Sequence, residues 1–309
     1  MWLLFAFMTF VAWGTADLFY KKSNNESEKY SHLKTSVMVG LIMGLCAAGT
    51  IIIKKIDYDP KNLLIYLPVS AMYILSMTVG YFGLRYLELS VSSPIQNASG
   101  AVSCIMLMIF LHEIPDKFSL IAVFLITLGV ILLGVAETRG NEKLPESENG
   151  KYRKSLTAFM MPIAYCIIDS LGTFFDGRYL DDIASTPLVN VTEDNLEDVA
   201  NISYELTFFA VAVILFIYIR IIKKEKFALT RQGSRIAAAS FETAGQFAYV
   251  YALSGNAVVA ALVVASYCIC SALLARLFLK EKLTAKQYTA VALVISGIII
   301  LGIIEGIES

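Results

Sequence analysis

The sequence predicts an all-α integral membrane protein with ten transmembrane helices, arranged as two inverted repeats of five helices each. Three observations lead to this fold class. The chain of 309 residues is too apolar for a soluble protein, with 57% hydrophobic residues, 17% charged residues and a mean hydropathy of +0.66. Ten apolar runs alternate with polar breaks, and part of the first half of the chain recurs in the second half.

The apolar runs have the length that a membrane span needs. A bilayer core of about 30 Å is crossed by about 20 residues of helix, in which every backbone polar group finds a partner within the segment. The runs of the first half are residues 1–20, 35–53, 63–84, 91–111 and 118–136. Those of the second half are residues 155–175, 202–219, 236–253, 257–279 and 288–304.

A polar stretch at residues 138–154 is the most linker-like part of the chain and separates the two groups of five runs. It divides the protein into a first repeat at residues 1–137 and a second repeat at residues 155–309. The second repeat contains an acidic stretch at residues 176–201, which we expect to be a loop between its first two spans.

The recurrence itself covers residues 81–137 and 249–305, which align without a gap. The alignment pairs Gly129 with Gly297 and Gly134 with Gly302, and it pairs Phe110-Leu111-His112-Glu113 with Phe278-Leu279-Lys280-Glu281. Because a unit of five helices crosses the membrane an odd number of times, the second copy enters from the opposite face. Inverted repeats in transporters place the substrate site near the midplane, between the halves.

The Lys and Arg residues set the expected orientation. Twenty of the 25 fall in the loops after the odd-numbered spans and in the linker, and five fall on the other side. By the positive-inside bias, the side with twenty is cytoplasmic. Both termini and the acidic loop at residues 176–201 are then external, and we expect a multi-pass protein of the plasma, or inner, membrane.

Several short motifs stand out along the chain. They are Trp13-Gly14, the acids Glu113 and Glu281, and the aromatic ends of two spans, Tyr81-Phe82-Gly83-Leu84-Arg85 and Tyr249-Val250-Tyr251-Ala252-Leu253. With this spacing the sequence resembles a known family, the EamA-type branch of the drug/metabolite transporter superfamily. The resemblance implies ten helices in two halves and transport of a metabolite. Two features depart from it: many members keep both termini in the cytoplasm, and the long acidic loop is not typical.

Three acids inside the spans are the first candidates for the site, because a charge in hydrocarbon is costly and usually faces a cavity or a partner. Asp17 follows Trp13 by four residues and Asp169 follows Tyr165 by four, so the first helix of each half presents an aromatic and an acid on one face. The alternative for Asp17 and Asp169 is a solvated position at the membrane interface. Glu242, deeper in its span, is the candidate proton carrier.

Polar and aromatic residues complete the predicted substrate site. Gln96 and Asn97 follow Pro94, which interrupts the hydrogen bonding of the helix; the amides either line the cavity or bond to a neighbouring helix. Gln246 lies one turn after Glu242. Tyr267 is in mid-span, whereas the tyrosines near span ends are more often interface anchors. Acids beside an aromatic ring favour a substrate with a positive nitrogen.

Other function classes fit less well. A membrane enzyme would need a nucleophile or metal motif such as His-Glu-x-x-His, and a channel would not need acids at matching positions of both halves. We therefore predict a secondary active transporter that moves a small polar metabolite, an amino acid, an amine or an organic cation, by alternating access with protons as the coupling ion. The alternative is an uncoupled exchanger or a nucleotide-sugar-like transporter. No enzyme activity, cofactor, metal or nucleic-acid partner is expected, and the protein is a monomer or a homodimer.

Overall fold

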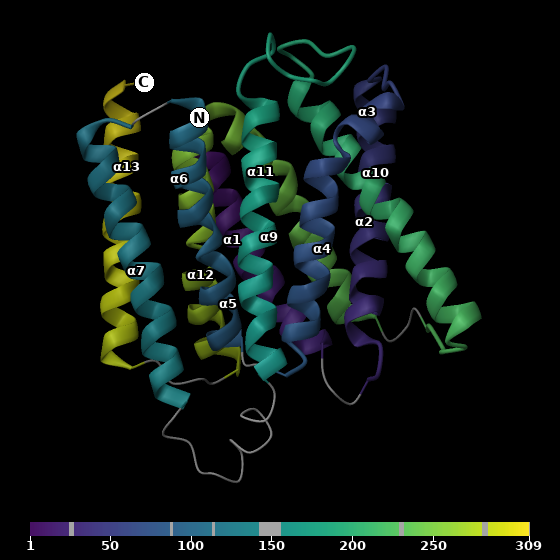
Figure 1. The fold of residues 1–309 in the computed structure, drawn as a ribbon, viewed down its shortest axis with the longest axis horizontal. Helices are drawn as coiled ribbons and strands as arrows, with labels where there is room; N and C mark the ends of the chain where they lie inside the picture. The colour runs from purple at the N-terminus through teal and green to yellow at the C-terminus, as the bar shows by residue number, and fades with distance from the viewer. Residues whose placement is uncertain are drawn as a thin grey trace.

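The computed structural model describes residues 1–24, 28–86, 89–112, 115–141, 156–228, 232–279 and 284–308. Within these ranges the chain forms helices joined by loops, and no strand is present. The helices stand side by side, and both termini lie at the same end of the molecule (Figure 1). Glu113, Glu281 and most of the predicted linker at 138–154 lie outside the described residues.

The first half contains two helix breaks that the apolar runs do not show. Its helices are α1 (Trp2–Ser23), α2 (Ser31–Lys54), α3 (Lys61–Ile65), α4 (Leu67–Gly83), α5 (Leu89–Asn97), α6 (Ser99–Leu111) and α7 (Lys117–Asn141). The predicted run at 63–84 is divided at Tyr66, between α3 and α4. The run at 91–111 is divided at Ala98, four residues after Pro94, so the break lies later than the proline alone indicates.

The second half contains α9 (Leu156–Leu180), α10 (Leu196–Ile217), α11 (Gly233–Ala265), α12 (Cys268–Leu274) and α13 (Ala285–Glu308). Short π-helices extend α10 and α12, namely η1 (Tyr218–Ile222) and η3 (Ala275–Leu279). Asn256 is non-helical inside α11, and its Oδ1 accepts a hydrogen bond of 3.1 Å from the amide of Val259, as a cap does. The chain therefore turns at the predicted gap between the runs at 236–253 and 257–279.

The acidic stretch at 176–201 is helical at both ends. Helix α9 continues to Leu180 and α10 begins at Leu196, so only residues 181–195 are irregular. Asp176 and Asp198 are consequently buried within helices, with exposed fractions of 0% and 4%. The expectation that these two acids lie in an external loop is wrong for both. Asp181 and Asp182, in contrast, are exposed in the loop.

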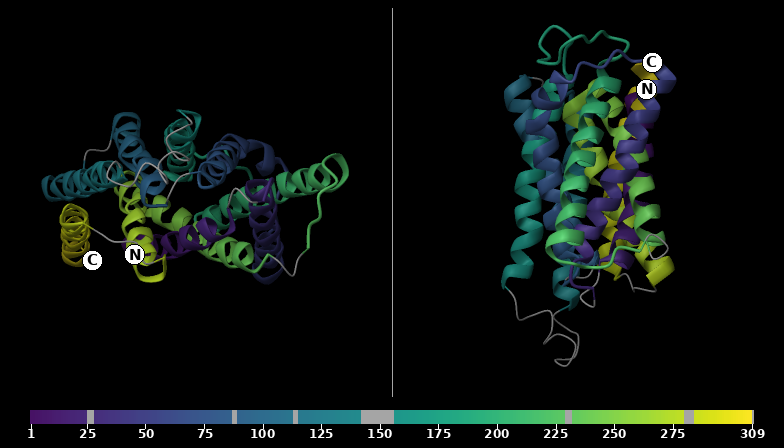
Figure 2. Two further views of the ribbon diagram at one scale, coloured as in Figure 1. Left: turned by 90° about the horizontal axis from the view of Figure 1, so that it is seen from below. Right: turned by 90° about the vertical axis from the view of Figure 1, so that its right-hand side faces the viewer.

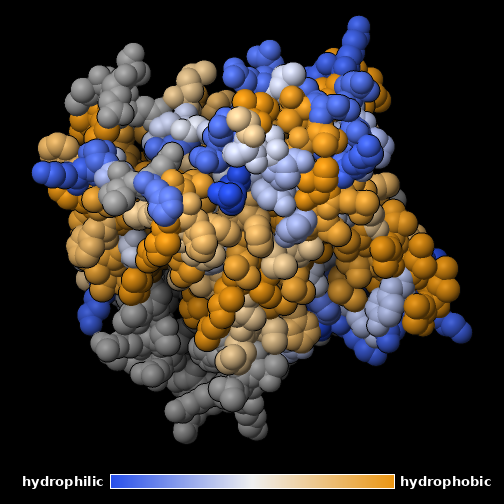
Figure 3. Space-filling view, turned by 45° about the horizontal axis from the view of Figure 1, so that its top comes forward, coloured by the Kyte–Doolittle hydropathy of each residue, from blue (hydrophilic) through white to orange (hydrophobic). Residues whose placement is uncertain are grey.

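The surface of the helices is apolar where a membrane would surround it. Four described helical stretches are long and apolar enough to cross a bilayer, Trp2–Ser23, Ser31–Lys54, Leu196–Ile222 and Gly233–Phe278. Large apolar side chains point outward from them and from their neighbours, including Leu45, Ile109, Phe124, Ile214 and Ile299, each more than half exposed. Figure 3 shows the apolar surface below a more polar end. The protein is therefore an integral membrane protein that crosses the bilayer several times.

Helix pairs connect the two halves of the chain. Helix α1 packs against α11 and α4 packs against α9, while α2 pairs with α10, α6 with α11, and α7 with α13. Figure 2 shows α7 and α13 together at one end of the molecule. Each of these pairs joins one helix of the first half to one helix of the second. The space between the halves is therefore walled by helices from both.

The pair α7 and α13 approaches closely at two glycines. A Cβ on Gly129 would lie 2.4 Å from Cγ2 of Val294, and a Cβ on Gly297 would lie 2.7 Å from Cγ1 of Ile126. The same added Cβ atoms would also lie close to the backbone of the partner helix, 2.8 Å from the carbonyl oxygen of Ala290 for Gly129 and 2.9 Å from that of Ala122 for Gly297. Small residues at helix contacts are characteristic of packing in membranes. The two glycines paired by the sequence repeat thus face each other's helix.

Candidate functional site

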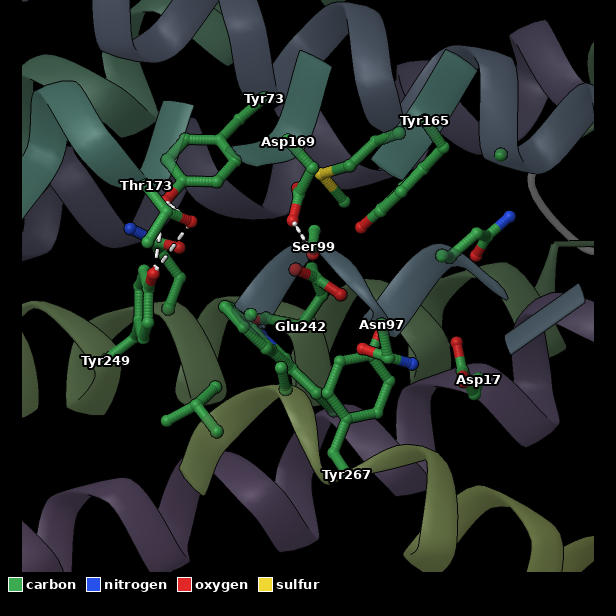
Figure 4. A pocket seen from close by; sticks show the side chains of 18 of the residues that line it. Asp17, Tyr73, Asn97, Ser99, Tyr165, Asp169, Thr173, Glu242, Tyr249 and Tyr267 are labelled. Atoms are coloured by element: carbon green, nitrogen blue, oxygen red, sulfur yellow. Dashed lines mark hydrogen bonds between the residues drawn. The ribbon is translucent and has the colours of Figure 1, made fainter. Parts of the chain in front are cut away.

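A cavity lies between the halves and is lined by all seven residues singled out from the sequence, Asp17, Gln96, Asn97, Asp169, Glu242, Gln246 and Tyr267. Its empty space, including its open mouth, is about 740 Å³. In Figure 4, Asp169 and Glu242 point into it from opposite walls, and Asp17 lies toward one end. The structure therefore brings these residues together. Their role in substrate binding stays a prediction.

Asp17 is held on α1 by serines from two other helices. One carboxylate oxygen accepts hydrogen bonds from the hydroxyl of Ser93 on α5, at 2.9 Å, and from that of Ser271 on α12, at 2.7 Å. The residue is only 8% exposed. A buried acid held in this way does not fit the solvated position at the membrane interface that was the alternative for it.

Asp169 repeats the arrangement in the second half. On α9, its carboxylate accepts hydrogen bonds from Ser99 on α6, at 2.8 Å, and from Ser76 on α4, at 3.3 Å. Both bonds come from neutral hydroxyls, and no ion pair with Asp169 is found among the described residues. The two acids at matching positions are therefore fixed in direction while their charge is left without a counter-ion.

Glu242 lies in the first part of α11, before Asn256, and has fewer partners than the two aspartates. One carboxylate oxygen accepts a hydrogen bond of 3.2 Å from the hydroxyl of Tyr20, and the backbone carbonyl accepts one of 3.2 Å from the indole of Trp13. Both donors come from α1, so Glu242 sits at the main contact of the two halves. The side chain is 7% exposed. It is free to face a proton or a ligand in the cavity.

Gln246, one turn after Glu242, is fully buried at 0% exposed. Neither its amide nitrogen nor its amide oxygen has a hydrogen-bond partner within the described residues. Leaving a buried polar group unpaired costs about 1–3 kcal/mol. Since the residue lines the cavity, a bound molecule there can supply the missing donor and acceptor.

The amides of α5 bond within their own helix. The Gln96 amide donates to the hydroxyl of Ser92, at 3.0 Å. The Asn97 amide donates to the backbone carbonyl of Ser93, at 2.9 Å, and to its hydroxyl, at 3.1 Å. Both amides also line the cavity, and Asn97 interacts in addition with Tyr267 at the start of α12, so its contacts fit both of the predicted roles.

Aromatic rings form much of the wall. The indole of Trp13 packs edge-on against Tyr267, with centroids 5.7 Å apart, and at a tilt against Tyr249, at 4.9 Å. Tyr81 and Tyr165, like Tyr249, line the cavity, so placing the tyrosines near span ends at the membrane interface is wrong for these three. Sequence reasoning missed Tyr20, Tyr73 and Tyr204. The signal for Tyr20 was its position three residues after Asp17, on the same helix face.

Three hydroxyls close the end of the cavity nearer the acidic loop. The oxygens of Tyr73, Thr173 and Tyr249 lie 2.9, 3.2 and 3.1 Å apart around a triangle, drawn with dashed lines in Figure 4. We call these residues the hydroxyl triangle. They come from α4, α9 and α11, so the triangle joins both halves of the chain.

Ion clusters lie beyond the cavity in both directions along α11. At the start of that helix, the guanidinium of Arg235 pairs with Glu28 at 2.5 Å, and Lys34 pairs with the same acid at 2.7 Å. Burial acts to raise the pKa of Glu28, but hydrogen bonds and positive charge from Lys34 and Arg235 outweigh it and lower that pKa. Further along, Asp198 binds Lys54 at 2.6 Å and accepts a hydrogen bond from Tyr251 at 2.9 Å. We call these the Arg235 cluster and the Asp198 cluster.

The comparisons with known proteins agree with this arrangement. The model of the EamA-like transporter family matches residues 1–135 and 185–303. The chain belongs to this family. As an EamA-like protein it is a membrane transporter of the drug/metabolite type, which confirms the resemblance drawn from the sequence.

No curated protein matches the chain. Among solved structures, 28 chains match this EamA-like protein. One of them, described only as the crystal structure of a protein, is similar over 100% of this chain and 99% of its own, with a TM-score of 0.66 and 12% identity. A likeness at that identity shows a shared fold and carries no substrate.

Proposed function

We propose that this protein is a secondary active transporter for a small polar metabolite with a positive nitrogen, such as an amine or an amino acid. One observation carries the proposal. Three carboxyls line the cavity, and no Lys, Arg or His is among its lining residues within the described part of the chain. Buried carboxylates without counter-ions favour a proton or a cation as their partner. The rings of Trp13 and Tyr267 add faces that attract cations.

The same observation favours this substrate class over the alternative, a nucleotide sugar. A nucleotide sugar would bring phosphate groups against Asp17, Asp169 and Glu242, and like charges at close range in a medium of low dielectric repel strongly. Phosphate recognition generally uses Arg, Lys or backbone amides at helix N-termini. The cavity is therefore better matched to a cationic or zwitterionic metabolite than to an anionic one.

We further propose ten transmembrane helices in two inverted repeats that alternate in access to the cavity. The packing supports this. If α1, α2, α4 and α7 of the first half correspond to α9, α10, α11 and α13 of the second, the α1–α11 contact has its counterpart in the α9–α4 contact. The α2–α10 and α7–α13 pairs each join a helix to its own counterpart. Gly129 on α7 packs against α13, and its counterpart Gly297 on α13 packs against α7 in the same way. The Arg235 and Asp198 clusters are the candidate closures, since each joins helices of both halves outside the cavity.

Glu242 is the proposed proton-coupling group. It is a cavity carboxyl at the contact of α1 and α11, with a single side-chain hydrogen bond, from Tyr20, among the described residues. Protonation would remove its charge from the cavity, and loss of the proton would restore the attraction for a cation. Binding of the substrate and of the proton are then linked through one side chain.

The test begins with a ligand. A thermal-shift screen of amines, amino acids and nucleotide sugars identifies one, because a ligand at 100 times its dissociation constant stabilises by about 2.7 kcal/mol. In proteoliposomes with that ligand, Glu242→Gln should abolish uptake against a gradient while exchange continues. Glu205→Gln is the matched control, because Glu205 is also a buried acid, 1% exposed, but does not line the cavity. Accumulation by Glu242→Gln would remove Glu242 as the coupling group.

A further inference from the structure

Another buried acid, Asp176, is not used by the site described above. It lies on α9 and is 0% exposed, and the hydroxyl of Tyr66 donates a hydrogen bond to its Oδ1. Its Oδ2 is buried and has no partner among the described residues. A buried carboxylate oxygen with neither a cation nor a donor is costly, so the observation calls for a ligand.

Asp176 is aligned with the cavity along one helix face. Asp169, Thr173 and Asp176 follow each other at spacings of four and three residues, so they lie one above another on α9. At 1.5 Å per residue, the two acids are separated by about 10 Å along the axis. Thr173, between them, belongs to the hydroxyl triangle with Tyr73 and Tyr249. The hydroxyl triangle therefore lies between the level of Asp176 and the acids of the cavity.

The acidic loop lies at the other side of Asp176. Helix α9 ends at Leu180, and Asp181 and Asp182 follow at once as exposed residues. The loop is fastened to α3 by Asn62, whose side-chain amide exchanges two hydrogen bonds of 2.9 Å with the backbone of Val189. Figure 1 shows this loop above the ends of α9, α10 and α3. Exposed acids at this end attract protons to the surface.

The groups that face Asp176 from the packed helices carry hydroxyls and no positive charge. They are Tyr66 at the start of α4, Tyr73 on α4, Tyr204 on α10 and Tyr249 on α11. From α6, Leu107 packs against the neighbouring Gly177. Arg178, on α9 itself, is exposed. Asp176 thus sits among groups that can both give and accept protons.

We propose that Asp176 is a second proton site, which passes the coupling proton between the acidic-loop side and the cavity through the hydroxyl triangle. The carboxylate takes a proton at Oδ2. Because Oδ2 has no hydrogen-bond partner among the described residues, the protonated side chain first turns toward Thr173. A hydroxyl of the triangle then accepts the proton on its oxygen as it gives its own proton to the next oxygen, and the last hydroxyl releases a proton into the cavity, so each O–H bond that forms replaces one that breaks. Chains of ionisable side chains serve as proton relays inside membranes, and a hydroxyl group can both accept and donate a hydrogen bond. This proposal rests on the proton coupling proposed above and assigns a role to the acidic loop.

The test needs no substrate, because the probe is the proton. The chain has two tryptophans, and replacing Trp2 by Phe leaves Trp13, which contacts the backbone of Glu242 in the cavity, as the only indole fluorophore. A stopped-flow pH jump on this purified protein should give a fluorescence change as the cavity gains protons. Asp176→Asn in the same background should slow that change at least tenfold and leave its final amplitude unaltered.

Three further variants make the result decisive. Asp176→Glu retains a carboxyl and should restore most of the rate, whereas a purely structural role would not distinguish it from Asp176→Asn. Tyr66→Phe retains the acid and should keep the fast change, and Glu205→Gln, a buried acid on α10, should leave it unaltered. Elution as a single monodisperse peak confirms that each variant is folded.

The proposal is overturned if Asp176→Asn responds as fast as the parent, or if the parent gives no response to pH. It is also overturned if the variant alters the response to sodium at constant pH, because Asp176 would then be a cation site. These outcomes are separate from the transport assay. If Glu242→Gln still accumulates the ligand, Glu242 is not the coupling group. The pH-jump experiment would then still test whether Asp176 carries protons to the cavity.

Discussion

The close approach of α7 and α13 gives a sharp prediction for stability. In Gly129→Ala, the new Cβ would lie 2.4 Å from Cγ2 of Val294 and 2.8 Å from the carbonyl oxygen of Ala290. Carbon atoms in contact are normally about 3.5–4.0 Å apart. The side chain of Val294 can turn, but the carbonyl belongs to the backbone of α13. The helices must therefore separate by about 1 Å, and overpacking of this kind costs about 1–3 kcal/mol.

A control variant corrects for a second effect of the substitution, the gain in helix propensity. Replacing glycine by alanine inside a helix also gains about 1 kcal/mol of helix propensity. Gly49→Ala, in α2, gains the same amount, but nothing lies within 4 Å of its new Cβ. We expect Gly49→Ala to melt above the unmodified protein in detergent, and Gly129→Ala to be less stable than Gly49→Ala by about the overpacking cost, 1–3 kcal/mol.

The reciprocal glycine extends the test. Gly297→Ala places a Cβ 2.7 Å from Cγ1 of Ile126 and 2.9 Å from the carbonyl oxygen of Ala122, so it should destabilise the protein to a similar degree. The double variant should cost less than the sum, because the first substitution already separates the helices that the second would push apart. If Gly129→Ala and Gly297→Ala both melt as high as Gly49→Ala, the inferred close contact of α7 and α13 is refuted.

Two other predictions concern the Arg235 cluster and the cavity wall. Lys34 and Arg235 lower the pKa of Glu28 in the folded protein. The stability that the ionised Glu28 adds is therefore fully present above the unfolded pKa of 4.5 and is lost as the pH falls through the lower pKa of the folded state. Glu28→Gln should therefore melt lower than the parent at about pH 7, and the difference in melting temperature should shrink as the pH falls below 4.5, unlike the exposed control Glu193→Gln. Equal melting of Glu28→Gln and the parent at every pH would exclude a role for the charge. Tyr267→Leu should weaken binding of a cationic ligand by about 1–2 kcal/mol, measured by calorimetry, and an unchanged affinity would exclude a cation–ring contact.

The sequence was informative where burial of a polar group is costly. Asp17, Asp169, Glu242 and Gln246 stand out in apolar runs, and the structure brings them to one cavity. The reason is physical: a membrane leaves such side chains few places other than a cavity or a partner. The apolar runs likewise anticipated the membrane helices, and the recurrence aligns the two glycines that the structure places at the contact of α7 and α13. The arrangement as ten spans in inverted repeats stays a proposal that the packing supports.

The remaining features depend on tertiary packing, which the hydropathy pattern does not record. The apolar run of α9 ends at Phe175, yet the helix continues to Leu180, and the polar residue that follows the run, Asp176, is buried with a hydrogen bond from Tyr66 of a neighbouring segment. Depth in the membrane also cannot be read from distance along the chain, and Tyr81 and Tyr249 therefore looked like interface anchors. Serines such as Ser271 gave no signal, since serine is tolerated in apolar helices by bonding to its own backbone.

The Arg235 and Asp198 clusters have a consequence for the resting protein. In the alternating-access cycle proposed above, opening one side separates the charges of one cluster while the other remains paired. The fraction of empty molecules open to each side is then set by the difference in strength between the two clusters. The Arg235 cluster combines three charged side chains, with Arg235 and Lys34 buried, whereas Lys54 in the Asp198 cluster is 44% exposed. Salt screens the exposed pair more strongly, so ionic strength alone should shift the empty carrier toward opening at the Asp198 cluster.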